Sequence, residues 1–422
     1  MPAIINMMPE PSSLLSLPIT SEENVAAHWK NLLLEKFNAT NGTKGISLYV
    51  HLPFCERLCT FCSFKPHITI NHKVEQIYVD MLLKEWQLYL ALFEKKPIIK
   101  QIYFGGGTPT FFTPENLKRI INFIKDTAEV SPKAELSIEA NISNTSALHL
   151  TTLYKAGFNT ISFGIQDFDH EVQQTIRRTQ ATGKVFHITS LARSVGFKVV
   201  NYDILYGLPN QSRKTIINTI YRINEIKPER ISLLQYIHDP KSFPSQKPYE
   251  QKLPVPEEAM KLAEIARCML LESGYTEIGM GVFVLKKDPL YKAFKHKTIH
   301  RNLMGYTQYQ TEITVGIGAG AISDVWDAIA INRKKIRKYY QCLENGEIPI
   351  NSCFKIDGAK LALRNHIYNL QCNLQTSWEG NEKGYLLKIS KRFQSYPFQN
   401  LIKVSETGIK IKKAGRQYIH NC

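Results

Sequence analysis

The 422-residue chain lacks any apolar run long enough to cross a membrane. Such a run would need about 18 consecutive residues with few or no charges. The first residues, Met1 to Asn6, also lack the basic-then-apolar order of a secretory signal. Together, these two absences predict a protein that stays in the cytoplasm.

A regular disulfide framework is missing as well. Three of the eight cysteines are clustered, and the other five are scattered without repeated spacing. The scattered ones are Cys268, Cys342, Cys353, Cys372 and Cys422. This usage argues against a small secreted domain held by disulfides and is typical of a reducing compartment.

Dense runs of one charge are absent, although the chain is strongly basic. It has 53 Lys and Arg against 37 Asp and Glu, a formal net charge of +16. Because the charge is spread rather than gathered into a short basic run, we expect no nucleic-acid partner. The basic balance can attract an anionic small substrate, or it can reflect a general bias in lysine usage.

The alternation of segments predicts an α/β protein. The hydrophobic content of 43% is that of a globular chain with room for one large domain and a smaller one. Strand-like runs are expected at Ile46–His51, Ile98–Phe104, Glu135–Ala140, Thr160–Gly164, Lys198–Tyr206 and Arg230–Tyr236. Between the strands, helices are expected at Lys73–Phe93, Pro114–Lys125, Ser146–Lys155, Thr182–Val195 and Lys214–Ile226. Six such βα units predict an incomplete, TIM-like (β/α)6 barrel with its chemistry at the carboxyl ends of the strands.

We divide the chain into four parts. They are an N-terminal arm (1–45), a partial barrel (46–255), a barrel extension with substrate-side loops (256–330) and a smaller, mainly helical C-terminal lid domain (331–422). The arm contains a helix from Glu22 to Phe37, with Ser21 as its N-cap. Residues 281–310 are expected to be loop-like, and Val315 to Ser323 to form a glycine-rich turn.

Three cysteines follow the first predicted strand at close spacing. Cys55, Cys59 and Cys62 lie within one short loop, so their thiolates can point at one centre. A structural zinc site takes four protein ligands, and no Cys or His follows at finger spacing. A [4Fe–4S] cluster held by three cysteines keeps one iron open for another molecule. The spacing therefore favours a catalytic cluster, with a zinc loop or chance clustering as alternatives.

A glycine string, Gly105-Gly106-Gly107-Thr108-Pro109-Thr110, ends the second predicted strand. Glycine lets a backbone pass close to a ligand and present bare N–H and C=O groups. No lysine follows at the spacing of a phosphate loop, and no dinucleotide fingerprint is complete. The string indicates a ligand cradle, with a generic turn as the alternative.

These motifs together resemble the radical S-adenosylmethionine (SAM) superfamily, and within it the oxygen-independent coproporphyrinogen III oxidase-like family. The resemblance runs from about residue 46 to the C-terminus. Besides the glycine string, it rests on Tyr49 to Cys55, Ser137 to Asn141, Phe163 to Phe168, Asp203 to Pro209, His300 to Thr307 and Gly318 to Ser323.

The resemblance implies a cofactor set and a site. It implies a [4Fe–4S] cluster on Cys55, Cys59 and Cys62 and one or possibly two SAM molecules. The implied SAM contacts are Tyr49, Phe61, Gly106, Gly107, Thr108, Glu139, Gln166, Arg178, Asp203, Ile237 and Ile322. Four of them have a stated ordinary alternative: Tyr49 can be a core residue, Glu139 and Asp203 can be helix caps, and Arg178 can belong to a solvated face.

The resemblance also implies a reaction. In the family, an electron from the cluster cleaves SAM to a 5′-deoxyadenosyl radical, and the protein aims that radical at one hydrogen. In the oxidase the hydrogen lies on a tetrapyrrole propionate, which then loses carbon dioxide to give a vinyl group. This implies an oxidoreductase of porphyrin and haem biosynthesis, an anionic tetrapyrrole substrate and an electron donor such as flavodoxin or ferredoxin.

Three segments depart from the oxidase pattern. Phe64 stands where the oxidase has a further cysteine, and Gln308 replaces a threonine. Met280-Gly281-Val282-Phe283 replaces Met-Asp-His-Phe, which removes one charged and one titratable side chain. The Cys-x-Phe ending of the cysteine loop instead resembles the haem chaperone, haem-degrading and methyltransferase branches of the same family. A C-methyltransferase and a haem chaperone are therefore the alternative functions.

Overall fold

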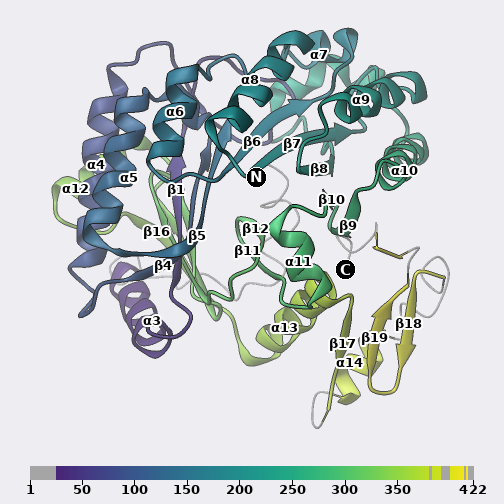
Figure 1. Cartoon of the computed structure of the whole chain (residues 1–422). Helices are drawn as coiled ribbons and strands as arrows, with labels where there is room; N and C mark the ends of the chain where they lie inside the picture. The colour runs from purple at the N-terminus through teal and green to yellow at the C-terminus, as the bar shows by residue number, and fades with distance from the viewer. Residues whose placement is uncertain (1–24, 380–382, 391–399, 413–414, 417–422) are drawn as a thin grey trace.

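A large open sheet forms the centre of the computed structural model, which describes residues 25–379, 383–390, 400–412 and 415–416 (Figure 1). Its strands are β1 (Ile46–Leu52), β4 (Ile98–Gly106), β5 (Glu129–Ala140), β6 (Thr160–Gln166), β7 (Val199–Tyr206), β8 (Arg230–Gln235), β9 (Thr276–Gly279), β10 (Val282–Val284), β13 (Ile313–Ile317), β14 (Ile322–Asp324), β15 (Ala328–Asn332) and β16 (Ile350–Lys355). Their order is β16-β15-β14-β13-β1-β4-β5-β6-β7-β8-β10-β9. The strands from β13 to β8 in this order run parallel.

The predicted βα units are confirmed. Helices α4 (Val74–Leu90), α5 (Pro114–Thr127), α6 (Ala147–Lys155), α8 (Thr182–Val195) and α9 (Arg213–Ile226) connect the parallel strands. They cover the outer side of the curved sheet (Figure 1). The first and last strands of the sheet, β16 and β9, do not pair with each other, so the sheet is open, as expected for an incomplete barrel. None of the described helices is both long and apolar enough to span a membrane.

Two sequence-based expectations about the later chain are wrong. Residues 281–310 are not a loop: they contain β10, α11 (Pro289–Lys295), β11 (His300–Asn302) and β12 (Gly305–Thr307). Elements this short carry too few residues to show a period of 2 or 3.6. For the glycine-rich turn only the bounds are wrong: the turn lies between β13, which is buried along its whole length beside β1, and β14, so the two ends of the expected segment belong to strands.

Segments before and after the predicted barrel also contact this sheet: a helix packs on it, and a strand pairs within it. Helix α3 (Val25–Thr40) buries Trp29 and Leu33 in the main core, and the ring of its Phe37 stacks on Phe93 with centroids 3.9 Å apart. Its predicted N-cap, Ser21, and its predicted first residues lie outside the described residues. Strand β15 crosses the predicted boundary at residue 331 and pairs with β14 and β16.

The C-terminal region combines helices with a separate small sheet. Its elements are α12 (Ile336–Glu344), β16, α13 (Gly358–Asn373), β17 (Gln375–Ser377), α14 (Lys383–Ser390), β18 (Ile402–Ser405) and β19 (Gly408–Ile411). Strands β17, β19 and β18 pair in that order beside α13, away from the large sheet (Figure 1). The division into four parts remains a prediction.

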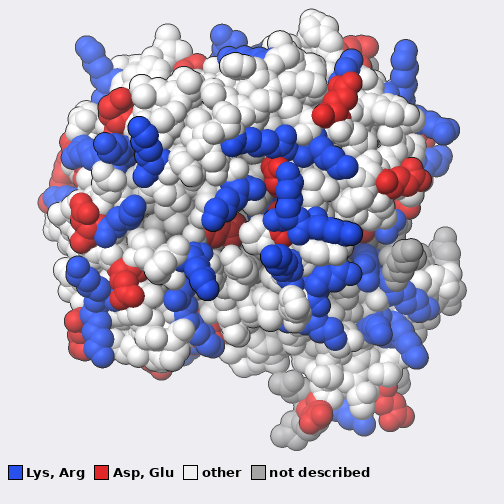
Figure 2. Space-filling model, viewed as in Figure 1, with Lys and Arg blue, Asp and Glu red and all other residues white. Residues whose placement is uncertain are grey.

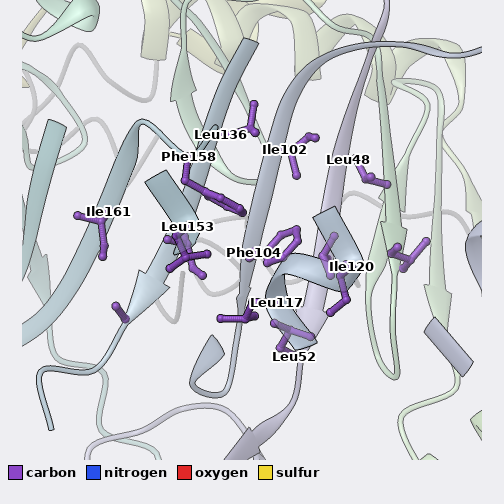
Figure 3. Close-up of a cluster of buried hydrophobic side chains, with 14 of the residues drawn as sticks. Leu48, Leu52, Ile102, Phe104, Leu117, Ile120, Leu136, Leu153, Phe158 and Ile161 are labelled. Carbon is purple, nitrogen blue, oxygen red and sulfur yellow. The ribbon is translucent and has the colours of Figure 1, made fainter. Parts of the chain in front are cut away.

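The two faces of the parallel sheet differ in chemistry. Outward-facing side chains form an apolar layer under the helices, where the edge of Phe104 meets Phe158 with ring centroids 5.0 Å apart (Figure 3). Residues of alternate positions, such as Gln101, Tyr103 and Glu135, line a cavity instead. The sequence of a parallel strand that is buried on both faces is usually a continuous run of apolar residues. Polar residues on the inner face therefore indicate an internal site.

A buried carboxyl group ties α4 to the last part of the sheet. Glu85 accepts hydrogen bonds from the Gly318 N–H at 2.7 Å, the Asn332 side-chain amide at 2.6 Å and the Tyr339 hydroxyl at 2.6 Å. Burial raises the pKa of Glu85 to about 8 in spite of these donors. One side chain thus joins α4, the turn after β13, the end of β15 and α12.

Replacing Glu85 by alanine should destabilise the protein because three buried donors lose their acceptor. We expect the free energy of unfolding to fall by roughly 3 kcal/mol, measured by chemical denaturation. Glu94→Ala, at an exposed position, is the matched control and should change it little. Equal stabilities of the two variants would contradict the role given to Glu85.

Candidate active site

The cysteine loop is fixed at both ends by backbone contacts. Strands β2 (Phe54–Cys55) and β3 (His67–Ile68) pair in parallel around it. Within the loop, the N–H of Thr60 donates to the carbonyl of Ile176 at 3.2 Å. The loop follows β1 directly, so it lies at the carboxyl end of the parallel sheet, where the sequence predicted it.

The three cysteines line one cavity of about 400 Å³. Cys55 Sγ lies 3.2 Å from the Thr108 hydroxyl, and an Arg178 Nη1–H donates to Cys59 Sγ at 3.7 Å. Burial raises the pKa of Cys55 to about 11 and that of Cys62 to about 12. Both are therefore protonated at neutral pH, and iron would have to replace the proton to stabilise each thiolate.

The donor set suits an iron–sulfur cluster better than a single ion. Among the residues that the structure describes, no three Cys, His, Asp or Glu side chains converge tightly enough to hold one metal ion. A mononuclear zinc needs all its sulfur ligands at about 2.3 Å from one point. Cluster ligands bind separate irons, so three thiols around one cavity fit a cubane with an open iron.

The glycine string packs directly on the cysteine loop. The N–H of Gly107 donates to the carbonyl of Leu52, and that of Thr108 donates to the carbonyl of Phe54, both at 2.9 Å. A Cβ on Gly107 would lie 2.7 Å from the Phe54 carbonyl oxygen, and one on Gly105 would lie 3.0 Å from a Glu139 carboxylate oxygen. Only glycine allows this approach, which opens the end of β4 toward the cavity.

Glu139 stands near the end of β5 and faces the same cavity. Its two carboxylate oxygens accept the Tyr103 hydroxyl at 3.0 Å and the Gly106 N–H at 3.2 Å. Burial, and next the negative charge of Asp203, raise the pKa of Glu139. The carboxylate bonds to the glycine string, so in this structure it does not cap the following helix.

Gln166, Arg178 and Asp203 also line this cavity. Asp203 accepts from the Ser162 hydroxyl at 2.9 Å and from the Asn201 amide at 2.8 Å. An Arg178 Nη2–H donates to the Gly164 carbonyl at 3.0 Å, while its buried Nε has no partner among the described residues. A buried donor without a partner is costly, and a polar ligand in the cavity would satisfy it.

Three of the implied SAM contacts do not line this cavity. Ile237 is 39% exposed and lines a small adjoining pocket with Phe61, Gln166 and Asp203. Tyr49 is buried against Met304 and is hydrogen-bonded to His51 at 2.8 Å. Ile322 packs against a separate apolar group around Ile329 and Ile356. The roles of all the implied contacts remain predictions.

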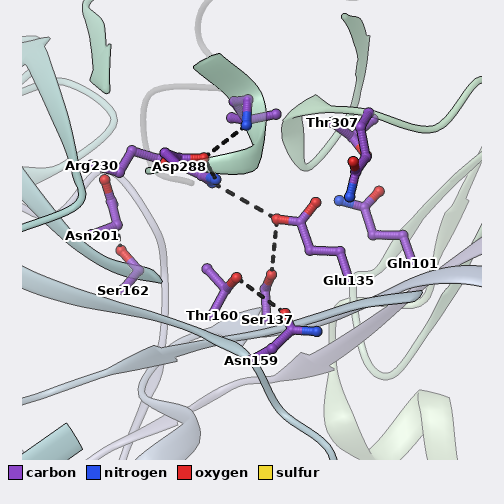
Figure 4. Close-up of polar contacts among 12 residues, drawn as sticks. Gln101, Glu135, Ser137, Asn159, Thr160, Ser162, Asn201, Arg230, Asp288 and Thr307 are labelled. Atoms are coloured by element: carbon purple, nitrogen blue, oxygen red, sulfur yellow. Dashed lines mark hydrogen bonds and ion pairs between the residues drawn. The ribbon is translucent and has the colours of Figure 1, made fainter. Parts of the chain in front are cut away.

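The sequence analysis missed a second cavity of about 100 Å³ deeper in the barrel, which we call the inner cavity. Ser162 and Asp203 line both cavities. In its wall Arg230 pairs with Asp288 through two hydrogen bonds of 2.8 and 3.0 Å and lies 3.8 Å from Glu135 (Figure 4). The sequence pattern that could have predicted this cavity is the presence of polar residues at every second position of otherwise apolar strands.

Comparison with known proteins gives consistent matches. The family model described as the radical SAM superfamily matches residues 49–222. The oxygen-independent coproporphyrinogen III oxidase of Synechocystis sp. is 34% identical over 352 residues, which cover 83% of this chain and 76% of the relative. That of Escherichia coli is 32% identical over 385 residues, covering 89% and 84%. The solved structure of the E. coli enzyme, whose title calls it a radical SAM enzyme, superposes with a TM-score of 0.84 at 29% identity and covers 96% of this chain and 95% of that chain.

Replacing Gly107 by alanine should disturb the contact between the glycine string and the cysteine loop. The added Cβ must displace backbone, so we expect the free energy of unfolding to fall by roughly 1–3 kcal/mol. The iron content after reconstitution should fall with it. Gly183→Ala is the control, because no atom lies within 4 Å of the added Cβ. Unchanged stability and iron content in Gly107→Ala would refute the close approach.

Replacing Cys59 by alanine should abolish iron–sulfur absorbance after anaerobic reconstitution, because the loop offers no spare ligand. The same result is expected for Cys55→Ala and Cys62→Ala. Cys268→Ala is the matched control, since this thiol is exposed on α10 (Pro256–Glu272), and it should retain the absorbance of the native protein. A Cys59→Ala variant with native iron content would overturn the assignment.

Proposed function

Because the chain belongs to the radical SAM superfamily and, within it, to the oxygen-independent coproporphyrinogen III oxidase family, we propose that it decarboxylates propionate side chains of a tetrapyrrole. It is a radical SAM enzyme, and its cofactors are a [4Fe–4S] cluster and SAM. The proposed substrate is coproporphyrinogen III or a closely similar polyanion. Each propionate carboxylate would lose one hydrogen atom to the cleaved SAM, one electron to a one-electron acceptor, and one carbon dioxide, and so become a vinyl group.

One observation carries this proposal: the cysteine loop, the glycine string and the Glu139, Arg178 and Asp203 side chains line a single cavity. The cluster and SAM supply a one-electron cleavage of a sulfonium when they are bound. Cys55, Cys59 and Cys62 would hold the cluster. The backbone of Gly106 to Thr108, with Glu139 and Arg178, would orient SAM and keep water from it.

The charge distribution supports an anionic substrate. Figure 2 shows Lys and Arg side chains gathered over the region of α11. Five exposed lysines lie in the segment 286–297, namely Lys286, Lys287, Lys292, Lys295 and Lys297. The inner side of the same segment contributes Leu290 to the inner cavity. A positive field over this wall would raise the local concentration of a polycarboxylate.

The electron would enter from outside the cysteine loop. Arg57 and Leu58 are exposed between the first two cysteines, and Leu58 is 40% exposed. An electron donor such as flavodoxin or ferredoxin could therefore approach the cluster closely.

We place the protein in the cytoplasm, since the seven described cysteines are free and a reducing compartment keeps them so.

Methyl transfer is the second candidate function, because two departures from the oxidase pattern line the cavities. Phe64 lies in the wall of the larger cavity, and Val282 lies in the wall of the inner cavity. Phe64 replaces a cysteine of the oxidase pattern, and Val282 replaces its histidine. Val282 would lie beside the substrate arm, and Phe64 would lie beside the cluster and SAM.

Product analysis tests the proposal. Reconstituted protein is incubated anaerobically with SAM, dithionite and coproporphyrinogen III, and the products are analysed by mass spectrometry. We expect 5′-deoxyadenosine and the loss of one carbon dioxide and two hydrogens from each converted propionate. A methyl gain with S-adenosylhomocysteine would instead establish methyl transfer. Stable haem uptake without conversion would point to a chaperone.

Replacing Arg178 by alanine should weaken SAM binding more than cluster assembly. The guanidinium has a buried donor without a described partner and faces the cavity, so we expect a loss of affinity of about tenfold or more. Affinity is measured by anaerobic equilibrium dialysis, and iron content is measured on the same sample. Arg213→Ala, exposed at the start of α9, should match the native protein. Loss of iron in Arg178→Ala would make this residue structural.

A further inference from the structure

The inner cavity is too small for a whole ligand of this enzyme. It measures about 100 Å³, whereas sites for drug-sized molecules are usually about 300–1,000 Å³. Neither a tetrapyrrole ring nor a complete SAM molecule fits into that space. The cavity does have room for one short aliphatic arm. It meets the larger cavity at Ser162 and Asp203, so such an arm would lie next to the proposed SAM site.

Arg301 supplies this cavity with a positive charge. Its side chain lines the cavity wall and donates to the Gln371 side-chain oxygen at 3.3 Å. No carboxylate of the described residues lies within ion-pair distance of it. Burial lowers the pKa of Arg301, although nearby Tyr306 and Cys372 act in the opposite direction. Arg301 is half-buried, and a cation withdrawn from water in this way is normally paired with an anion.

The other charged groups of the cavity wall already have partners. Arg230 is neutralised by its two hydrogen bonds to Asp288 and by nearby Glu135, which also accepts from the Ser137 hydroxyl at 3.4 Å (Figure 4). Asp203, at the opening to the larger cavity, accepts from Ser162 and Asn201 as described above. Arg301 is thus the cation within the described cavity wall whose charge has no protein counterpart.

The hairpin that carries Arg301 is held by hydrogen bonds to the sheet on one side and to helix α13 on the other. Its hairpin, β11 and β12, is held to the sheet by Asn302, whose amide donates to Gln101 at 2.7 Å. On the other side the Tyr306 hydroxyl donates to the Gln371 carbonyl at 2.8 Å, and His300 is hydrogen-bonded to Tyr368. Helix α13 therefore fixes the guanidinium at the end of the cavity before any ligand binds.

We propose that Arg301 binds the carboxylate of one propionate arm of the substrate inside the inner cavity. This inference rests on the proposed function, because it takes a tetrapyrrole with propionate arms as the ligand. An aliphatic chain would cross the cavity beside Leu234 and Val282, and its carboxylate would meet the guanidinium. Arg301 would then select a carboxylate-bearing arm and set how deeply that arm reaches.

Equilibrium binding without turnover tests this inference. Coproporphyrin III, the stable oxidised form with intact propionates, is titrated anaerobically into reconstituted protein in the absence of reductant, followed by fluorescence. SAM is titrated separately. The variants are Arg301→Gln, Arg301→Lys and, as a matched control, Arg337→Gln at an exposed position of α12. Iron content and thermal unfolding are recorded for every variant.

We expect Arg301→Gln to raise the Kd for coproporphyrin III by about tenfold to a hundredfold, as for a lost charge-assisted hydrogen bond. Arg301→Lys, which keeps the charge, should lose less. The control should equal the native protein, and the SAM affinity, the iron content and the unfolding temperature should stay unchanged throughout.

The outcomes separate the two proposals. Native affinity of Arg301→Gln for coproporphyrin III overturns the inference and leaves the proposed function standing. A lower SAM affinity with unchanged porphyrin binding also overturns it and assigns Arg301 to the SAM carboxylate. Parallel loss of stability and of both affinities in the Gln and Lys variants assigns it a structural role. No coproporphyrin binding by the native protein overturns the proposed function itself.

Discussion

The site depends on one close contact, between the glycine string at the end of β4 and the backbone of the cysteine loop. Two N–H groups, of Gly107 and Thr108, donate to carbonyls of the segment that carries Cys55. No side chain can stand between them, because a Cβ would overlap a carbonyl oxygen. The contact brings the Thr108 hydroxyl to Cys55 and leaves bare backbone facing the cavity. The cysteine loop and the glycine string are thereby joined into a single unit.

A second set of contacts holds the cysteine loop and the glycine string to the rest of the sheet. Strand β13 pairs with β1, and the N–H of Gly318 in the turn after it donates to buried Glu85. The Gly318 position also has no room for a Cβ, which would lie 2.4 Å from the carbonyl oxygen of His51. Both edges of β1 are thus held by strands whose ends carry glycine. The geometry of the cysteine loop is determined from both sides at once.

Much of this arrangement could be predicted from the sequence, because the parallel strands are long enough to show their pattern. The cysteine spacing and the string from Gly105 to Thr110 marked the site, and the structure brings them together with Glu139, Arg178 and Asp203. What the sequence did not reveal depends on contacts between distant segments. The short elements after residue 281 show no period, and the place of Arg301 in the cavity wall depends on its contact with α13, not on its neighbours in the chain.

The pairing of β1 with β13 also bears on how the protein is made. Ile46 lies opposite Ile313, so most of the chain must leave the ribosome before that edge of β1 has its partner. Until then the strand presents unpaired backbone and apolar side chains, which is the state that favours misassembly during synthesis. Stable loading of iron and sulfide should therefore follow completion of the barrel. Cluster assembly would then report that the whole polypeptide has reached its native topology.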